Sequence, residues 1–368
     1  MAENRAFIHA DLFTITADAL RTEHCWLHDI VLFYTFKAFQ YKGISVLMGI
    51  LIVATAVVLI AAARVTAASY LSLLLITLPA ILITHWAWLA RPQLWSFLLF
   101  AVFIFLMERY RRDRNNHIFW LFPLMILWSN LHGGAILAFP VVGAYLVGEG
   151  LDLVFKRSAL GVRGYKRLYA VLLLLVAATF VSPYGPHILR AALSHIFAPE
   201  TGSLGHPDLR NLDWKSITFT DYPVFFVTLA ITAILAILSW RRVAISHVIL
   251  FAGLAFMSTK QGRHAPLFFF AVAAILPNYV ENLVRPVVDR LKQRLMPVAG
   301  GFVILVGIGI MILLVNHVIS IRGYFNTGLK PWRFPVQATE FIEKHQLPAN
   351  IFNSYEWGGY LQWHLFPA

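Results

Sequence analysis

Three polar side chains, Ser129, Asn130 and His132, stand beside Gly133 and Gly134 inside one of the most apolar parts of the chain. Polar groups are costly at membrane depth, so this cluster needs a physical reason. One interpretation is a tight turn between two helices, in which the glycines allow close packing and the polar groups satisfy freed backbone atoms. The other is a cavity at the membrane surface, where Asn130 and His132 donate hydrogen bonds to an anionic group.

We call such a polar interruption between two apolar stretches a tip. Two further tips carry an arginine each. Arg91-Pro92-Gln93 lies among tryptophans, and Arg263-His264 follows another apolar stretch. A guanidinium presents a planar fork of donors to phosphate oxygens, which suits a lipid-phosphate site. The alternative is an aromatic belt from which each arginine extends to the membrane interface. The predicted phosphate-binding residues are Arg91, Gln93, Asn130, His132, Arg263 and His264.

The first outer segment contributes carboxylates, of which Asp11 and Asp29 are the catalytic candidates. A carboxylate there could act as a general base toward an acceptor hydroxyl, or could hold a divalent cation with a substrate phosphate. A divalent cation is the one cofactor that these residues suggest. The histidines lack the spacing typical of zinc sites, and Cys25 is the single cysteine, so the sequence does not predict a zinc site.

The composition indicates that membrane helices position these residues. The chain is 59% hydrophobic and 13% charged, and its mean hydropathy of +0.69 lies outside the range of soluble domains. A net charge of +12 could suggest nucleic-acid binding, but the basic residues bunch at the ends of apolar segments. This is the positive-inside pattern, so the basic loops are predicted to be cytoplasmic and no nucleic-acid partner is predicted. The bunches lie at 109–114, 156–167, 241–242 and 285–294.

The lengths of the apolar stretches predict the number of crossings. One crossing takes roughly 20 residues, and the stretch between Arg114 and Lys156 has room for two with a turn near Asn130. The same reasoning puts turns at Arg91 and Arg263, so all three tips face outward together. The predicted fold is an all-α polytopic membrane protein of about ten transmembrane helices. They lie near 45–64, 68–89, 94–108, 117–131, 134–155, 168–183, 223–240, 246–259, 264–280 and 298–320.

Three regions follow from this topology. Residues 1–44 form an outer segment, in which 26–41 is either a membrane span or a helix lying in the interface. Residues 45–321 form the transmembrane domain, with an outer surface helix at 187–197. Residues 322–368 begin an α/β-like outer domain, with a helix from Pro335 to about Lys344 and a short strand at 350–353. Since the N-terminus falls outside without a signal-peptide pattern, we expect a transmembrane helix before residue 1 and more of the outer domain after residue 368.

Six stretches of the sequence resemble a known group of proteins. They are DLFT at 11–14, CWL at 25–27, RPQ at 91–93, LWSNLHGG at 127–134, RHAPLF at 263–268 and FNSYEWGGYL at 352–361. They are similar to the marker stretches of bacterial multispanning proteins related to the C-type membrane glycosyltransferases. That superfamily includes protein O-mannosyltransferases, aminoarabinose transferases and oligosaccharyltransferases. The resemblance runs over nearly the whole chain, and LHGG and NSYEWGGYL are its most specific parts.

The resemblance implies a glycosyltransferase in the bacterial inner membrane that takes a sugar from a polyprenyl-phosphate carrier at the outer face. It implies that an aspartate of the first outer loop serves as base or metal ligand, and that arginine or lysine holds the carrier phosphate. It also suggests that Tyr355, Glu356 and Trp357, in the C-terminal outer segment, lie near the acceptor. The implied partners are the polyprenyl-phosphate-linked sugar and membrane lipids.

Two other functions fit the sequence. A lipid or solute transporter, or flippase, would use the same kind of helical bundle without chemistry. No internal repeat is visible and no acidic residue is predicted near the middle of a span, where coupling ions usually bind, which counts against it. A non-catalytic membrane scaffold would instead predict that the three polar tips tolerate substitution.

Overall fold

In a computed structural model, the described residues are 25–65, 69–185, 215–295, 334–347 and 357–365, with single positions at 305, 309, 312, 351 and 353. Over these residues the chain is helical and contains no strand, which confirms the all-α part of the predicted fold. The helices are α1 (Trp26–Val65), α2 (Tyr70–Ser72), α3 (Leu78–Ile83), α4 (Gln93–Asp113), α5 (Leu121–Leu131), α6 (Ala138–Val154), α7 (Gly161–Ala178), α9 (Pro223–Leu238), α10 (Ile245–Lys260), α11 (Ala265–Leu295), α13 (Val336–His345) and α14 (Gly358–Leu365). Short helical turns, η1 (Leu73–Thr77), η2 (Thr84–Ala87), η3 (Asn116–Trp120), η4 (Gly133–Leu137) and η7 (Gly262–His264), adjoin them.

Within the described residues, four helical segments are long and apolar enough to cross a membrane. They are Trp26–Val65, Tyr70–Ala87, Gln93–Asp113 and Gly133–Val154. Two shorter apolar helices, α9 and α10, have 16 residues each. The predicted intervals from 45–64 to 264–280 each overlap a helix, while 298–320 lies mostly outside the described residues. The membrane character of the chain is therefore supported, but the predicted number of about ten spans is not confirmed.

The helix α1 joins the predicted outer segment to the first predicted span. It is interrupted at Gln40, whose backbone adopts φ 54° and ψ −152°, so two helical segments meet there. The bend brings the chain close to itself, because a Cβ added to Gly43 would lie 2.5 Å from the Cβ of Phe39. The stretch 26–41 is thus helical, and it ends at the point where the direction of the helix changes.

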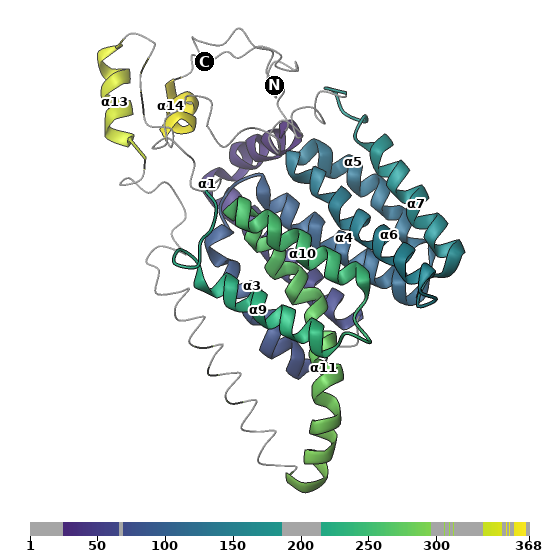
Figure 1. The fold of residues 1–368 in the computed structure, drawn as a ribbon. Helices are drawn as coiled ribbons and strands as arrows, with labels where there is room; N and C mark the ends of the chain where they lie inside the picture. Colours follow the sequence, from purple (N-terminus) through teal and green to yellow (C-terminus); the bar gives the residue numbers. More distant parts are fainter. Residues whose placement is uncertain are drawn as a thin grey trace.

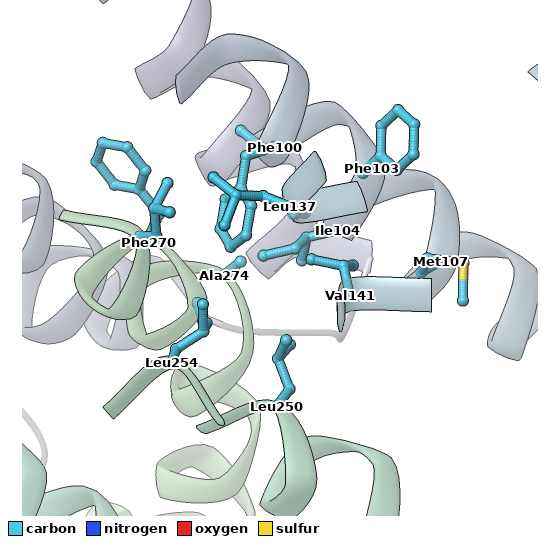
Figure 2. Close-up of a cluster of buried hydrophobic side chains, with 14 of the residues drawn as sticks. Phe100, Phe103, Ile104, Met107, Leu137, Val141, Leu250, Leu254, Phe270 and Ala274 are labelled. Atoms are coloured by element: carbon cyan, nitrogen blue, oxygen red, sulfur yellow. The ribbon is translucent and has the colours of Figure 1, made fainter. Parts of the chain in front are cut away.

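The helix α4 lies inside the bundle and packs against α1, α5, α6 and α11 (Figure 1). The helix α10 packs against α6 and α11. Figure 2 shows one layer of this core, built from buried apolar side chains of α4, η4, α6, α10 and α11: Phe100, Phe103, Ile104, Met107, Leu137, Val141, Leu250, Leu254, Phe270 and Ala274. Between membrane helices such interdigitated side chains contribute mainly through van der Waals contact.

The LHGG tip and the Arg263 tip have the same backbone arrangement. A single residue in extended conformation separates two helical segments: His132 (φ −162°, ψ 138°) between α5 and η4, and Gln261 (φ −144°, ψ 116°) between α10 and η7. The His132 side chain accepts the Gly134 N–H and so caps the new segment. The tight-turn interpretation therefore describes the backbone at LHGG.

Arginine side chains tie the basic loops together. Arg112 Nη1 donates to the Val65 carbonyl at 2.6 Å, which joins the ends of α4 and α1. Arg167 of α7 donates to the Arg114 carbonyl at 3.2 Å. Likewise, Arg157 Nη2, after α6, donates to the Val243 carbonyl, before α10, at 3.3 Å. These helix ends form what we name the basic end of the bundle, and the starts of α4, η4 and η7 form the tip end.

The C-terminal segment that is predicted to lie outside is helical where it is described. The predicted helix from Pro335 is confirmed by α13. The predicted strand at 350–353 is not seen at its two described positions, Ile351 and Asn353, which adopt no regular structure. The helix α14 packs on α1 through Trp363 and Phe36, whose ring centroids lie 5.3 Å apart in an edge-to-face arrangement. The predicted surface helix at 187–197 lies outside the described residues.

Candidate functional site at the tip end

The first turn of α4 brings together segments that are far apart in the sequence. Gln93 Nε2 donates to the backbone carbonyl of Arg263 at 3.4 Å, so the second and third tips lie side by side. Trp95 Nε1 donates to Nδ1 of His28, near the start of α1, at 3.1 Å. The predicted residues Gln93 and Arg263, and His28, the neighbour of the predicted Asp29, therefore meet around the start of α4.

The LHGG tip joins α4 through the next residue, Ser96. Trp128 Nε1 donates to Ser96 Oγ at 2.7 Å, and since an indole N–H can only donate, the Ser96 oxygen is the acceptor there. The hydroxyl hydrogen of Ser96 then points to His132 Nδ1, 2.6 Å away, which also accepts the Gly134 N–H at 3.2 Å. Two donors at Nδ1 leave the hydrogen of neutral His132 on Nε2.

The third tip is organised around Gln261. Arg263 Nε donates to Gln261 Oε1 at 3.1 Å, and His264 Nε2 lies 3.2 Å from the same oxygen. Burial, together with the adjacent charge of Arg263, lowers the pKa of His264 from 6.5 to about 4. His264 is therefore neutral at physiological pH, so an anion at this tip would be attracted by Arg263 and Lys260 rather than by the imidazole.

Asn130 holds three segments together. Its Oδ1 accepts from Trp26 Nε1 at 2.9 Å, and its Nδ2 donates to the carbonyls of Ile126 and Val181 at 2.7 and 2.8 Å. Both amide hydrogens are thus used within the chain, which leaves none for the predicted bond to a phosphate. Its contacts are those of a residue that positions the LHGG tip against the start of α1.

The other predicted residues fall into two groups. Arg91 and Asp29 are exposed, immediately before α4 and in the first turn of α1, and Trp357 is exposed just before α14. Asp29 follows His28 and so belongs to the tip end. Asp11, Tyr355 and Glu356 lie outside the described residues.

Sequence reasoning missed the contribution of the loop before α9. The Gly262 N–H donates to the Lys215 carbonyl at 3.0 Å, and Ser216 Oγ donates to the Lys260 carbonyl at 3.2 Å. This loop places the exposed side chain of Lys215 beside the third tip, where its Nζ forms an ion pair with Asp221 Oδ2 at 3.3 Å. The only hint in the sequence is the polar composition of 215–222, which does not specify a partner.

It also missed a set of ionisable residues at the basic end, where Glu108, Glu149 and His247 are buried. They lie in three different helices, α4, α6 and α10, and no spacing in the sequence links them.

The tip end offers cationic and neutral N–H donors around the start of α4, which suits a group with anionic oxygens. Within the described part of the chain, no group of three or more His, Cys, Asp or Glu residues could hold a metal ion. The predicted divalent cation thus has no ligand set among these residues. Comparison of the chain with protein-family models, with curated proteins and with solved structures finds no match.

Proposed function

We propose that the chain is a membrane glycosyltransferase that takes a sugar from a polyprenyl-phosphate carrier at the tip end of the bundle. The observation that supports it is the convergence at the first turn of α4. Gln93 contacts the Arg263 tip, and Ser96 contacts His132 of the LHGG tip. If the three tips were only turns between helices, their side chains would not have to lie close together. A site for the carrier phosphate, in contrast, requires hydrogen-bond donors from several sides.

In the proposed reaction, the bond between the sugar C1 and the phosphate oxygen breaks while the acceptor oxygen forms a bond to C1. Negative charge grows on the departing phosphate, and Arg91 and Arg263 stabilise it. His132, with its hydrogen on Nε2, is a neutral donor beside them. Asp29 takes the proton that the acceptor hydroxyl loses. The products are the glycosylated acceptor and the polyprenyl phosphate.

The proposal includes a membrane orientation. The basic end faces the cytoplasm, because loops rich in arginine and lysine stay inside, and the tip end faces outward. The C-terminal helix α14, which packs on the first part of α1, then lies on the outer side as well. For a bacterial chain this is the inner membrane.

The first prediction concerns Arg263. Substituting Arg263 by Ala should reduce sugar transfer about 10²–10³-fold, because one charged donor to the departing phosphate is lost. Arg263→Lys should fall between, since it keeps the charge and loses the planar fork. The measurement is transfer from polyprenyl-phosphate sugars in isolated membranes, with mass spectrometry of the lipid-linked sugars in cells. Arg241→Ala, an exposed arginine at the basic end, is the matched control and should retain activity.

Equal activity of Arg263→Ala and Arg241→Ala, at equal protein levels in the membrane, would remove Arg263 from the site. If loss of the whole chain changes neither the lipid-linked sugars nor their transfer, the enzymatic proposal fails.

A transporter or flippase is the second candidate function. The observation in its favour is the set of buried ionisable residues at the basic end, since such groups in membrane helices often bind coupling ions.

A further inference from the structure

Six polar side chains from four helices meet at the basic end, inside the bundle. They are Glu108 and Arg111 of α4, Tyr145 and Glu149 of α6, His247 of α10 and Tyr279 of α11. Glu149 and Tyr145 are fully buried, and His247 is 2% exposed. Ionisable groups buried within apolar helices are costly and are rarely kept without a function.

His247 lies at the centre of this cluster. Its Nε2 is 2.7 Å from Glu108 Oε1 and 3.0 Å from Arg111 Nη1. Its Nδ1 is 2.6 Å from the Tyr279 hydroxyl, which accepts the Ala244 N–H at 3.2 Å. Both ring nitrogens thus face groups that can accept a hydrogen.

The remaining side chains of the cluster surround the pair of His247 and Glu108. The Tyr145 hydroxyl donates to Glu108 Oε1 at 2.5 Å, and Arg111 Nε donates to Glu149 Oε1 at 2.8 Å. Ser158, in the loop after α6, donates to Glu149 Oε2 at 3.2 Å. These bonds connect the buried pair to a loop at the basic end.

The formal charges of the cluster do not balance while His247 is neutral. Within the six side chains, Glu108 and Glu149 carry two negative charges when ionised, and Arg111 carries one positive charge. The neighbouring pair of Asp152 and Arg157, 3.8 Å apart, adds one charge of each sign and leaves this excess unchanged. A buried net charge is unfavourable, and one proton on the imidazole would cancel it.

We propose that this cluster is a proton-binding site, in which His247 takes one proton from water at the basic end and forms an ion pair with Glu108. The hydrogen-bonding geometry accommodates both states. In the neutral state the Tyr279 hydroxyl donates to Nδ1, and in the imidazolium state Nδ1–H donates to the Tyr279 oxygen. Nε2–H donates to Glu108 Oε1 in both, so the 3.0 Å approach of Arg111 Nη1 to Nε2 is not a hydrogen bond in either state. Because the side chain of Arg111 is 16% exposed, the cluster reaches the surface at its edge.

Proton binding at His247 would strengthen the contact between α10 and α4. The ion pair of His247 with Glu108 draws the start of α10 toward α4, and the far end of α10 leads into the third tip at Gln261. The site is independent of the proposed sugar transfer, since it shares no residue with the tip end. It would serve a transporter equally well.

The test is nitrogen NMR of the full chain in lipid nanodiscs with ¹⁵N-labelled histidine, which separates neutral from protonated imidazole. Comparison with His247→Gln assigns the His247 signals, and His117, exposed in η3, provides an internal reference. Between pH 5 and 8, where imidazoles change charge, His247 should pass from protonated to neutral. In Glu108→Gln its proton affinity should fall about tenfold, because the charged acceptor is lost.

Tyr279→Phe provides a second comparison that leaves both members of the ion pair in place. It removes the acceptor of Nδ1–H, so the proton affinity of His247 should fall here too. The proposal is overturned if His247 keeps one protonation state throughout this pH range. It is also overturned if His247 titrates identically in the wild type and in the folded variants, because the cluster would then not bind the proton.

Discussion

At the scale of single residues, the polar groups of the tip end are held by hydrogen bonds that give each of them one role. Ser96 accepts from Trp128 and donates its one hydroxyl hydrogen to His132, and this arrangement fixes the imidazole tautomer. The positions of the polar tips between apolar stretches could be predicted from the sequence. The role of Asn130 could not, because its partners Trp26 and Val181 lie 104 and 51 residues away.

Gly134 provides a test of this arrangement. A Cβ there would overlap Ser96 Oγ and lie 2.6 Å from His132 Nδ1. We expect Gly134→Ala to separate Ser96 from His132 and to destabilise the fold by about 1–3 kcal/mol. The measurement is the unfolding temperature in detergent, together with transfer activity.

Gly143, in α6, is the matched control, since nothing lies within 4 Å of an added Cβ. Gly143→Ala should leave stability unchanged or raise it by up to about 1 kcal/mol, because alanine favours the helix. If both variants unfold at the wild-type temperature, the close contact at Gly134 does not exist in the protein.

At the scale of helices, the hydrophobic pattern predicted where most of the described helices lie, while the predicted number of about ten membrane spans is not confirmed. Where a polar interruption divides an apolar stretch long enough for two crossings, the structure has two helices, as on either side of LHGG and of Arg263. The pattern did not predict the bend at Gln40, since hydropathy does not register backbone dihedrals. It also missed the buried pair of Glu108 and His247, which lie near the ends of their helices, where charges are normally solvated.

The contact between α6 and α10 depends on one small residue. A Cβ on Gly148 would overlap the backbone N and Cα of Ser246, and backbone atoms cannot rotate away. We expect Gly148→Ala to push the helices apart and to lower stability by about 3 kcal/mol, at the upper end for overpacked sites. Thermal unfolding in detergent measures this change.

The comparison variant is Gly253→Ala in α10, the partner helix of α6, where an added Cβ meets nothing within 4 Å. It should behave like the wild type. A Gly148→Ala protein as stable as Gly253→Ala would contradict the close approach of α6 and α10.

At the scale of the whole molecule, the arrangement separates two chemical environments, a basic end with a buried charge cluster and a tip end with arginines and N–H donors. Single cysteines at Lys215 and Arg241 test the proposed orientation, because Cys25 is buried and both positions are exposed. In spheroplasts, an impermeant maleimide should label Lys215→Cys at once, and should label Arg241→Cys only after the membrane is permeabilised. The opposite pattern would reverse the orientation.

The helix α4 takes part in both environments, with Gln93 and Ser96 at one end and Glu108 and Arg111 at the other. Inserting one residue between them would rotate one set against the other by about 100° and shift it by about 1.5 Å. Either the tip contacts or the charge cluster would then be lost. The length of α4 is therefore under a constraint that its apolar sequence alone does not impose, and natural variation in length should be confined to the loops.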